Sequence, residues 1–220
     1  MSSTIRRTVG VLVLAVALIF GFVVSRQVMQ PSSSEPQPAP DLSTMNTFVY
    51  DQSQPVASFE LTNELGEPVT EADLKGRWTF AFIGYTNCPD ICPATMAMLR
   101  QADKLMSSDL PQPDYLLISG DPEQDSPEKL QQYLDFFGPD FHGVTGEIDV
   151  LKGLAKSLNA VFVHRKTEGV NYVDHSGHLA LINPAGQMTA VLQPPHTPET
   201  VAEAFEKIYD WAKAQHPRAG

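Results

Sequence analysis

Apolar residues form one long uninterrupted run near the start of the chain, followed by shorter runs that polar turns separate. The long run covers the sixteen residues from Val9 to Val24 and follows two basic residues, Arg6 and Arg7. As a helix it is about 24 Å long, which approaches the ~30 Å hydrocarbon core of a bilayer. It is longer than a usual signal-peptide core, and no A-x-A-like cleavage site follows it. This pattern predicts an uncleaved signal anchor, with a cleaved signal peptide as the alternative.

The predicted anchor places the two ends of the chain on opposite sides of a membrane. Because basic residues stay on the cytoplasmic side, we expect the rest of the chain on the periplasmic side of the cytoplasmic (inner) membrane. The stretch 30–40 (QPSSSEPQPAP) is a Pro/Ser spacer that separates a domain from the bilayer. The predicted parts are a cytoplasmic N-terminus at 1–8, a single-pass transmembrane signal anchor at 9–25, a Pro/Ser-rich linker at 26–47 and a globular domain at 48–214.

The domain alternates between short apolar segments and segments with apolar residues at helical spacing. Turn signals at 63–66 and 183–186 each predict an antiparallel hairpin. Ser126 followed by Pro127 predicts the start of a helix. The alternation predicts an α/β fold, with a mixed central sheet flanked by helices on both faces. The predicted strands are 56–62, 67–70, 78–85, 115–119, 179–182 and 188–192, and the predicted helices are 94–106, 126–137, 148–158 and 197–211.

Composition and charge narrow the class of partner. Hydrophobic residues make up 42% of the chain and charged residues 19%, which is typical of a globular core. The net charge is −11, and from residue 41 onward there are 12 basic and 25 acidic residues, giving −13. Such a surface repels phosphate backbones, so we expect no nucleic acid partner, whereas cations and basic partner surfaces are favoured.

The two cysteines, Cys88 and Cys92, lie four residues apart where a predicted strand leads into a helix. In a helix this spacing puts both sulfurs on one face with the Cα atoms about 6 Å apart, so they can form a disulfide or a two-thiolate clamp. A disulfide across so short a loop stabilises a fold only modestly, which weakens a structural interpretation. Thiolates select Cu(I), with zinc as the main rival. Cu(I) needs two or three ligands and structural zinc normally four, so we expect a histidine to join the cysteines.

Four segments resemble the signature of the Sco family of copper proteins: GYTNCPDICP at 84–93, SGDPE at 119–123, DSPE at 125–128 and YVDHS at 172–176. The similarity spans roughly residues 50–210. It implies a thioredoxin-like fold and copper bound by Cys88, Cys92 and His175. It also implies copper delivery to the dinuclear copper site of cytochrome c oxidase subunit II, although some members are thought to act as thiol–disulfide reductants of that site or as redox sensors. Gly120 departs from the family pattern, which has a valine there, and we expect it to loosen the strand end without affecting a ligand.

His175 also has a physical case as the third ligand. It lies at the entry to the predicted strand that ends at Ile182, and the neighbouring Asp174 carboxylate could orient a metal-bound imidazole. The alternative is a loop histidine without a role. His178 would complete a Cys2His2 zinc site, but residues three apart on a strand point to opposite faces. We therefore expect His178 to be a buried, hydrogen-bonded core histidine.

Several other residues are candidates for shaping the site. Asp121 follows a predicted strand at the same end of the sheet as Cys88, and it either forms a turn ahead of a proline or shapes the site or a partner surface. Asp90 is expected to be exposed, where it would tune a thiol pKa or contact a partner. His164 lies near the site or on a solvated strand edge, and Met96 is expected in the core. The histidines expected at the surface, in loops or at the terminus, are His142, His196 and His216.

The favoured function is a copper metallochaperone, a binding protein rather than an enzyme with turnover. Its expected partners are cytochrome c oxidase subunit II, other copper chaperones or thiol reductants, and the membrane through the anchor. The main alternative is a membrane-anchored thiol–disulfide oxidoreductase, in which Cys88 and Cys92 carry electrons and His175 is incidental. A peroxide-reducing thiol enzyme needs a T-x-x-C pattern, which Thr86 does not provide because only one residue separates it from Cys88.

Overall fold

The computed structural model describes residues 3–29, 37–167 and 170–215. The chain divides into two compact units, Met1–Gln37 and Pro38–Gly220. The helices of the second unit are α2 (Ile91–Leu105), α3 (Pro127–Leu134), α4 (Ile148–Ser157) and α5 (Pro198–Gln215), with two 3₁₀ turns at Ser43–Met45 and Glu71–Leu74. Its strands are β1 (Thr47–Pro55), β2 (Glu60–Asn63), β3 (Pro68–Thr70), β4 (Thr79–Gly84), β5 (Asp114–Ser119), β6 (Phe141–Thr145), β7 (Phe162–Thr167), β8 (Val170–His175), β9 (Leu179–Ile182) and β10 (Gln187–Leu192).

The first unit contains a single helix, α1 (Ser3–Met29), among its described residues. No helix within the described part of the chain meets the length and apolarity needed to cross a membrane. The predicted anchor at 9–25 and its topology therefore stay predictions. Residues 30–36 of the predicted linker, and His216, lie outside the described residues.

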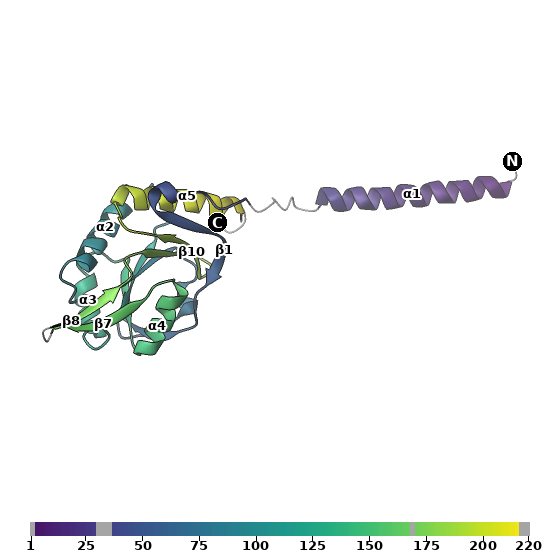
Figure 1. The fold of residues 1–220 in the computed structure, drawn as a ribbon. Helices are drawn as coiled ribbons and strands as arrows, with labels where there is room; N and C mark the ends of the chain where they lie inside the picture. Colours follow the sequence, from purple (N-terminus) through teal and green to yellow (C-terminus); the bar gives the residue numbers. More distant parts are fainter. Residues whose placement is uncertain (1–2, 30–36, 168–169, 216–220) are drawn as a thin grey trace. The chain divides into compact units, whose positions relative to one another are not determined.

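An eight-stranded mixed sheet forms the centre of the second unit, in the order β1-β10-β9-β4-β5-β6-β2-β3. The edge strand β1 lies beside β10 (Figure 1). Strands β4, β5 and β6 run parallel, and every other neighbouring pair is antiparallel. Strands β7 and β8 form a separate antiparallel hairpin. The parallel strands end together, so the segments that follow β4 and β5 emerge at the same edge of the sheet.

Two apolar clusters cover the two faces of this sheet. In β4 every side chain is buried, and alternate residues serve opposite faces because a strand has a two-residue period. Phe80 packs with residues of α2, α3 and α5 on one face, while Ile83 packs with residues of α4 on the other. The β7–β8 hairpin contributes Phe162 and Val173 to this second cluster. The predicted mixed sheet with helices on both faces is therefore confirmed.

Most of the predicted elements are confirmed, including both hairpins at the predicted turns. Ser126 caps α3, where its Oγ accepts the N–H of Lys129 at 3.3 Å. That helix ends at Leu134, earlier than predicted, whereas α5 extends beyond the predicted end at 211. Three elements were not predicted, because their short runs mix polar and apolar residues without a clear period: β1, β6 and the β7–β8 hairpin.

Candidate metal centre

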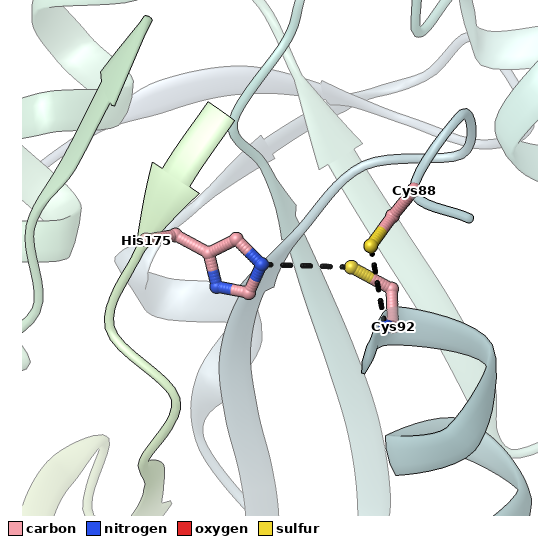
Figure 2. Close-up of side chains that lie close together, drawn as sticks. All are labelled: Cys88, Cys92 and His175. Carbon is pink, nitrogen blue, oxygen red and sulfur yellow. Dashed lines mark hydrogen bonds between the residues drawn. The ribbon is translucent and has the colours of Figure 1, made fainter. Parts of the chain in front are cut away.

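The two cysteines lie where the central strand β4 leads into α2. Cys88 is in the connecting loop and Cys92 is in the first turn of the helix. The Cys92 side chain is completely buried, Cys88 is half-buried, and both are free thiols. The backbone N–H of Cys92 donates to the Cys88 sulfur at 3.4 Å (Figure 2). The start of the helix therefore holds the two sulfurs next to each other, as their spacing predicted.

His175 approaches the cysteines from the β7–β8 hairpin, 83 positions after Cys92 in the chain. Its Nε2 atom lies 3.6 Å from Cys92 Sγ, on the side of the imidazole that faces both sulfurs (Figure 2). The ligand atoms of Cys88, Cys92 and His175 all lie within 4.8 Å of one another, and they are the one such group found among the residues that the structure describes. The fold thus brings together the three residues predicted as ligands.

The hydrogen bonding of His175 prepares it to bind a metal. Its Nδ1 atom lies 3.0 Å from the carbonyl oxygen of Ser176. Because a carbonyl can only accept, Nδ1 carries the proton and Nε2 keeps its lone pair toward the sulfurs. Two sulfurs and one imidazole nitrogen form a soft set of three donors. This set fits Cu(I) better than it fits structural zinc, which normally takes four ligands.

His178 does not add a fourth ligand. It is buried, and its Nε2 atom donates to the Leu158 carbonyl at 3.0 Å. The prediction of a hydrogen-bonded core histidine is confirmed. Met96 is fully buried in the core, as expected.

The two thiols differ in acidity because they differ in burial and hydrogen bonding. Burial alone would raise the pKa of Cys88, but hydrogen bonds from the backbone of Asp90 and Cys92 outweigh it and lower that pKa. Burial is the largest cause of the strongly raised pKa of Cys92, and the neighbouring Cys88 adds to it. Cys88 is therefore the more reactive thiol. Cys92 keeps its proton until its sulfur binds a metal or forms a bond to another sulfur.

Tyr85 connects the two halves of the site. It is buried, and its ring meets the His175 ring edge-on with the centroids 6.2 Å apart. Its hydroxyl also interacts with Cys88 and contributes to the lowered pKa of that thiol. Burial, followed by the charge of Cys88, raises the pKa of Tyr85, so the phenol stays protonated and can donate. One side chain thus contacts ligands from both the loop and the hairpin.

Two glycines make room for this arrangement. A Cβ at Gly84 would lie 3.3 Å from Cys92 Sγ, and one at Gly120 would lie 3.1 Å from Val173 Cγ1. The N–H of Gly120 donates to the Gly84 carbonyl at 2.8 Å, which joins the ends of β4 and β5. The expectation that Gly120 loosens the strand end is wrong. Its lack of a side chain lets the hairpin that carries His175 pack closely through Val173.

The predicted surroundings of His175 need two corrections. His175 is the last residue of β8 rather than the entry to the strand that ends at Ile182, which begins at Leu179. Asp174 does not orient the imidazole, because successive strand residues point to opposite sides. It is exposed and forms an ion pair with Arg165.

The secondary candidates lie around the site but not among its ligand atoms. Asp90 is exposed and precedes α2 without a capping hydrogen bond from its side chain. Asp121 is buried, and burial, followed by the charge of Asp125, raises its pKa. His164 is partly exposed, with its Nε2 atom 3.9 Å from Asp121 Oδ1. Whether these residues affect the chemistry of the site stays a prediction.

The positions of two other histidines differ from expectation. His142 lies in β6 rather than in a loop, half-buried, with Nδ1 2.9 Å from Glu64 Oε1. His196 lies in the loop before α5, as expected, but it is half-buried, and its Nε2 donates to the Gly177 carbonyl at 3.1 Å. Both side chains are thus tied to the fold rather than free at the surface.

Two residues that shape the site were not recognised as such from the sequence: Tyr85 and Gly84. Both lie inside the segment 84–93 that resembles the Sco signature, which was the available signal. Spacing alone does not reveal that a phenol contacts a ligand from another part of the chain, or that a glycine leaves room for one.

Comparisons with known proteins agree with this geometry. The SCO1/SenC family profile matches residues 49–210. A "putative copper-binding protein" of Stutzerimonas stutzeri is 33% identical over 171 residues, covering 77% of this chain and 84% of that protein. The mitochondrial protein SCO2 of Saccharomyces cerevisiae is 34% identical over 164 residues, covering 73% of this chain. The chain spans 54% of the length of that mitochondrial relative.

Solved structures give the same answer for the fold. Arabidopsis thaliana ScoI with copper bound superposes with a TM-score of 0.66 at 28% identity, covering 70% of this chain and 98% of that one. Yeast Sco1 with copper bound superposes with a TM-score of 0.65 at 29% identity, covering 76% and 97%. The mixed α/β domain therefore has the thioredoxin-like architecture of Sco structures. With the family profile matching well over half of its length, the chain belongs to the SCO1/SenC family.

Proposed function

We propose that this protein is a copper metallochaperone that holds Cu(I) with Cys88, Cys92 and His175. The observation that carries the proposal is the group of three soft ligand atoms within 4.8 Å of one another. Its cargo would pass to the dinuclear copper site of cytochrome c oxidase subunit II. The N-terminal helix would anchor the chain in the cytoplasmic membrane, with the domain on the periplasmic side.

The unequal cysteines support an ordered exchange of the metal. Cys88 is half-buried and has a lowered pKa, so its thiolate would meet an incoming copper ion first. Cys92 would then lose its proton to solvent and bind through the resulting thiolate, while the Nε2 lone pair of His175 completes the set. Release would reverse this order, so a ligand of the partner would replace His175 first, Cys92 next and Cys88 last.

A metal-competition experiment tests this proposal. The full chain, in mild detergent and with its thiols reduced under anaerobic conditions, is offered Cu(I) and Zn(II) together. We expect one tightly held copper per chain, little zinc, and transfer of that copper to the reduced copper-binding domain of subunit II. Preferential zinc binding, or a reduced chain that holds no copper, would overturn the proposal.

The difference between the two thiols also favours a second candidate function, a thiol–disulfide oxidoreductase. The Cys88 thiolate would attack a partner disulfide, forming a mixed disulfide and releasing one partner thiolate. That thiolate would take the proton of Cys92, whose thiolate would then attack Cys88 and release the second partner sulfur. The partner gains two electrons and the Cys88–Cys92 pair becomes a disulfide. Partner reduction that survives His175→Ala but fails in Cys88→Ser would identify this activity.

A further inference from the structure

A buried carboxylate lies behind the metal centre, in the loop between β5 and α3. The Asp125 side chain is 1% exposed, and no ion pair links it to a basic side chain in the part of the chain that the structure describes. A buried charge without a cation is unfavourable unless hydrogen bonds compensate it. The donors that compensate Asp125 therefore indicate what it holds in place.

Asp125 joins three separate segments through its two carboxylate oxygens. Oδ1 accepts the backbone N–H of Thr86 at 3.1 Å and the Thr86 hydroxyl at 2.6 Å. Oδ2 accepts the Ser119 hydroxyl at 2.6 Å, at the end of β5. The Asp125 N–H donates to the Asp121 carbonyl at 2.9 Å, which fixes the loop that carries the carboxylate. Charge-assisted bonds of this kind are among the stronger ones in proteins.

Thr86 is the link between this carboxylate and the metal ligands, because it lies two residues before Cys88 in the loop after β4. Within that loop the Cys88 N–H donates to the Tyr85 carbonyl at 3.2 Å, so the backbone from 85 to 88 turns as a unit. A shift of Thr86 would therefore displace the Cys88 sulfur from Cys92 and His175.

We propose that Asp125 is a positioning residue for the metal centre, acting through Thr86 on the placement of Cys88. The inference rests on the proposed function, since it assigns Asp125 a role in forming that same site. Asp125 contacts neither ligand sulfur by hydrogen bond in the described residues, so its effect on the position of Cys88 passes through the loop backbone.

The chain offers variants that separate the effect of the Thr86 hydroxyl bond from the effect of the Asp125 charge and from the stability of the fold. Thr86→Val removes the hydroxyl bond at constant shape, whereas Thr86→Ser keeps the hydroxyl. Asp125→Asn removes the charge and one acceptor oxygen but retains the size of the side chain. Ser126→Ala is the control for stability, because it removes the cap of α3 next to Asp125 without touching Thr86.

The first measurement is Cu(I) affinity of the full chain in detergent, by competition with a chromophoric chelator. We expect Thr86→Val and Asp125→Asn each to weaken binding about tenfold, the cost typical of losing an outer partner of a metal ligand. The double variant should lose less affinity than the product of the two single losses, because both substitutions weaken the contact between Asp125 and Thr86. Thr86→Ser and Ser126→Ala should bind like the unmodified chain, even where Ser126→Ala lowers the melting temperature.

A second measurement does not depend on copper: the equilibrium between the Cys88–Cys92 disulfide and a glutathione buffer. We expect Thr86→Val to change this equilibrium constant about tenfold and Ser126→Ala to leave it unchanged. If the unmodified chain bound no copper, the proposed function would fail while this measurement still tested Asp125. Folded Thr86→Val and Asp125→Asn variants with unchanged affinity and unchanged equilibrium would overturn the inference, as would fully multiplicative losses in the double variant.

Discussion

The metal centre joins two regions that differ in how deeply they are packed into the fold: the cysteine segment after β4 and the β7–β8 hairpin that carries His175. The cysteine segment continues from β4, which is buried along its whole length between β9 and β5. The hairpin is a two-stranded sheet of its own, and its outer face exposes Val163 and Tyr172. Two of the proposed ligands thus come from the centre of the fold and the third from an outlying element. This division would suit the proposed metallochaperone, which has to bind a metal and also release it.

The hairpin is nevertheless fixed near His175. Its inward-facing residues Phe162 and Val173 are buried in the second apolar cluster. The Ser176 N–H donates to the Val161 carbonyl at 2.9 Å, and the Val161 N–H donates to the Ser176 hydroxyl at 3.0 Å. The ligand therefore lies at the end of the hairpin that is attached to the domain. The comparison predicts that changes on the cysteine side affect stability and binding together, whereas changes on the hairpin side affect mainly binding.

The largest effect is expected from the cysteines. Cys92→Ser and Cys88→Ser should each weaken Cu(I) binding by more than about 100-fold, because losing a ligand costs more than losing an outer partner. Cys92→Ser should also lower the free energy of unfolding by about 1–3 kcal/mol, since it buries a hydroxyl in an apolar cluster. Chelator competition and chemical denaturation measure the two effects. Equal stability of the two variants would contradict the assigned difference in burial.

His175→Ala tests the hairpin side of the comparison. We expect Cu(I) affinity to fall by about 10- to 100-fold, less than for a cysteine, because the two thiolates that remain can still hold Cu(I). The disulfide exchange of Cys88 and Cys92 and the melting temperature should change little. His164→Ala, on the same hairpin but outside the ligand group, is the matched control and should retain full affinity. A His175→Ala chain that binds copper as tightly as the control would remove the histidine from the site.

Gly120→Val tests how the hairpin is held against the sheet. A valine would crowd Val173 Cγ1, which lies 3.1 Å from the position of a Cβ at Gly120. We expect the shift of β8 to weaken Cu(I) binding about fivefold, corresponding to ~1 kcal/mol, the lower end of the cost of overpacking. Adding Val173→Ala should restore the affinity, because it creates the missing space. A double variant no better than Gly120→Val alone would show that crowding is not the cause.

The cysteine side was easier to predict from the sequence than the hairpin side, for physical reasons. An apolar run followed by a helix start at Cys88 and Cys92 is a local pattern, and the turn signals of the other hairpins are local as well. The β7–β8 hairpin mixes outward-facing charged and apolar residues, so no two-residue period marks it. His175 was found through the family resemblance together with its neighbour Asp174, and the role given to Asp174 was wrong.

The contacts missed from the sequence are those between distant segments. The sequence marks Asp125 only as part of a motif, although its carboxylate binds Thr86, 39 positions earlier in the chain. The close packing of Gly120 against Val173 is also invisible to spacing, because it depends on how two separate sheets meet. Local patterns indicate which elements form, whereas these contacts follow only from their three-dimensional arrangement.

The smallest effect is expected at the opposite end of the parallel strands, where His142 and Glu64 form a pair. The hydrogen bond to Glu64 raises the pKa of His142 above 6.5, so its stabilising contribution is present at low pH and is lost as the pH rises through that raised value. Burial opposes the lowering of the Glu64 pKa, but the bonds from His142 and from the Gly143 N–H prevail and bring it below 4.5. The Glu64 contribution is therefore lost as the pH falls through this lowered value.

The pair should contribute most between these two pKa values, by about 0.5–1 kcal/mol once solvent screening of the partly exposed imidazole is considered. His142→Gln should lower the free energy of unfolding by this amount near pH 6 and have a smaller effect above the raised pKa of His142. Denaturation across pH measures the difference. Copper affinity should stay unchanged, because neither residue belongs to the ligand group. A loss of copper affinity in this variant would mean that the two ends of the sheet are coupled, so that a change far from the cysteine segment and the hairpin also affects binding.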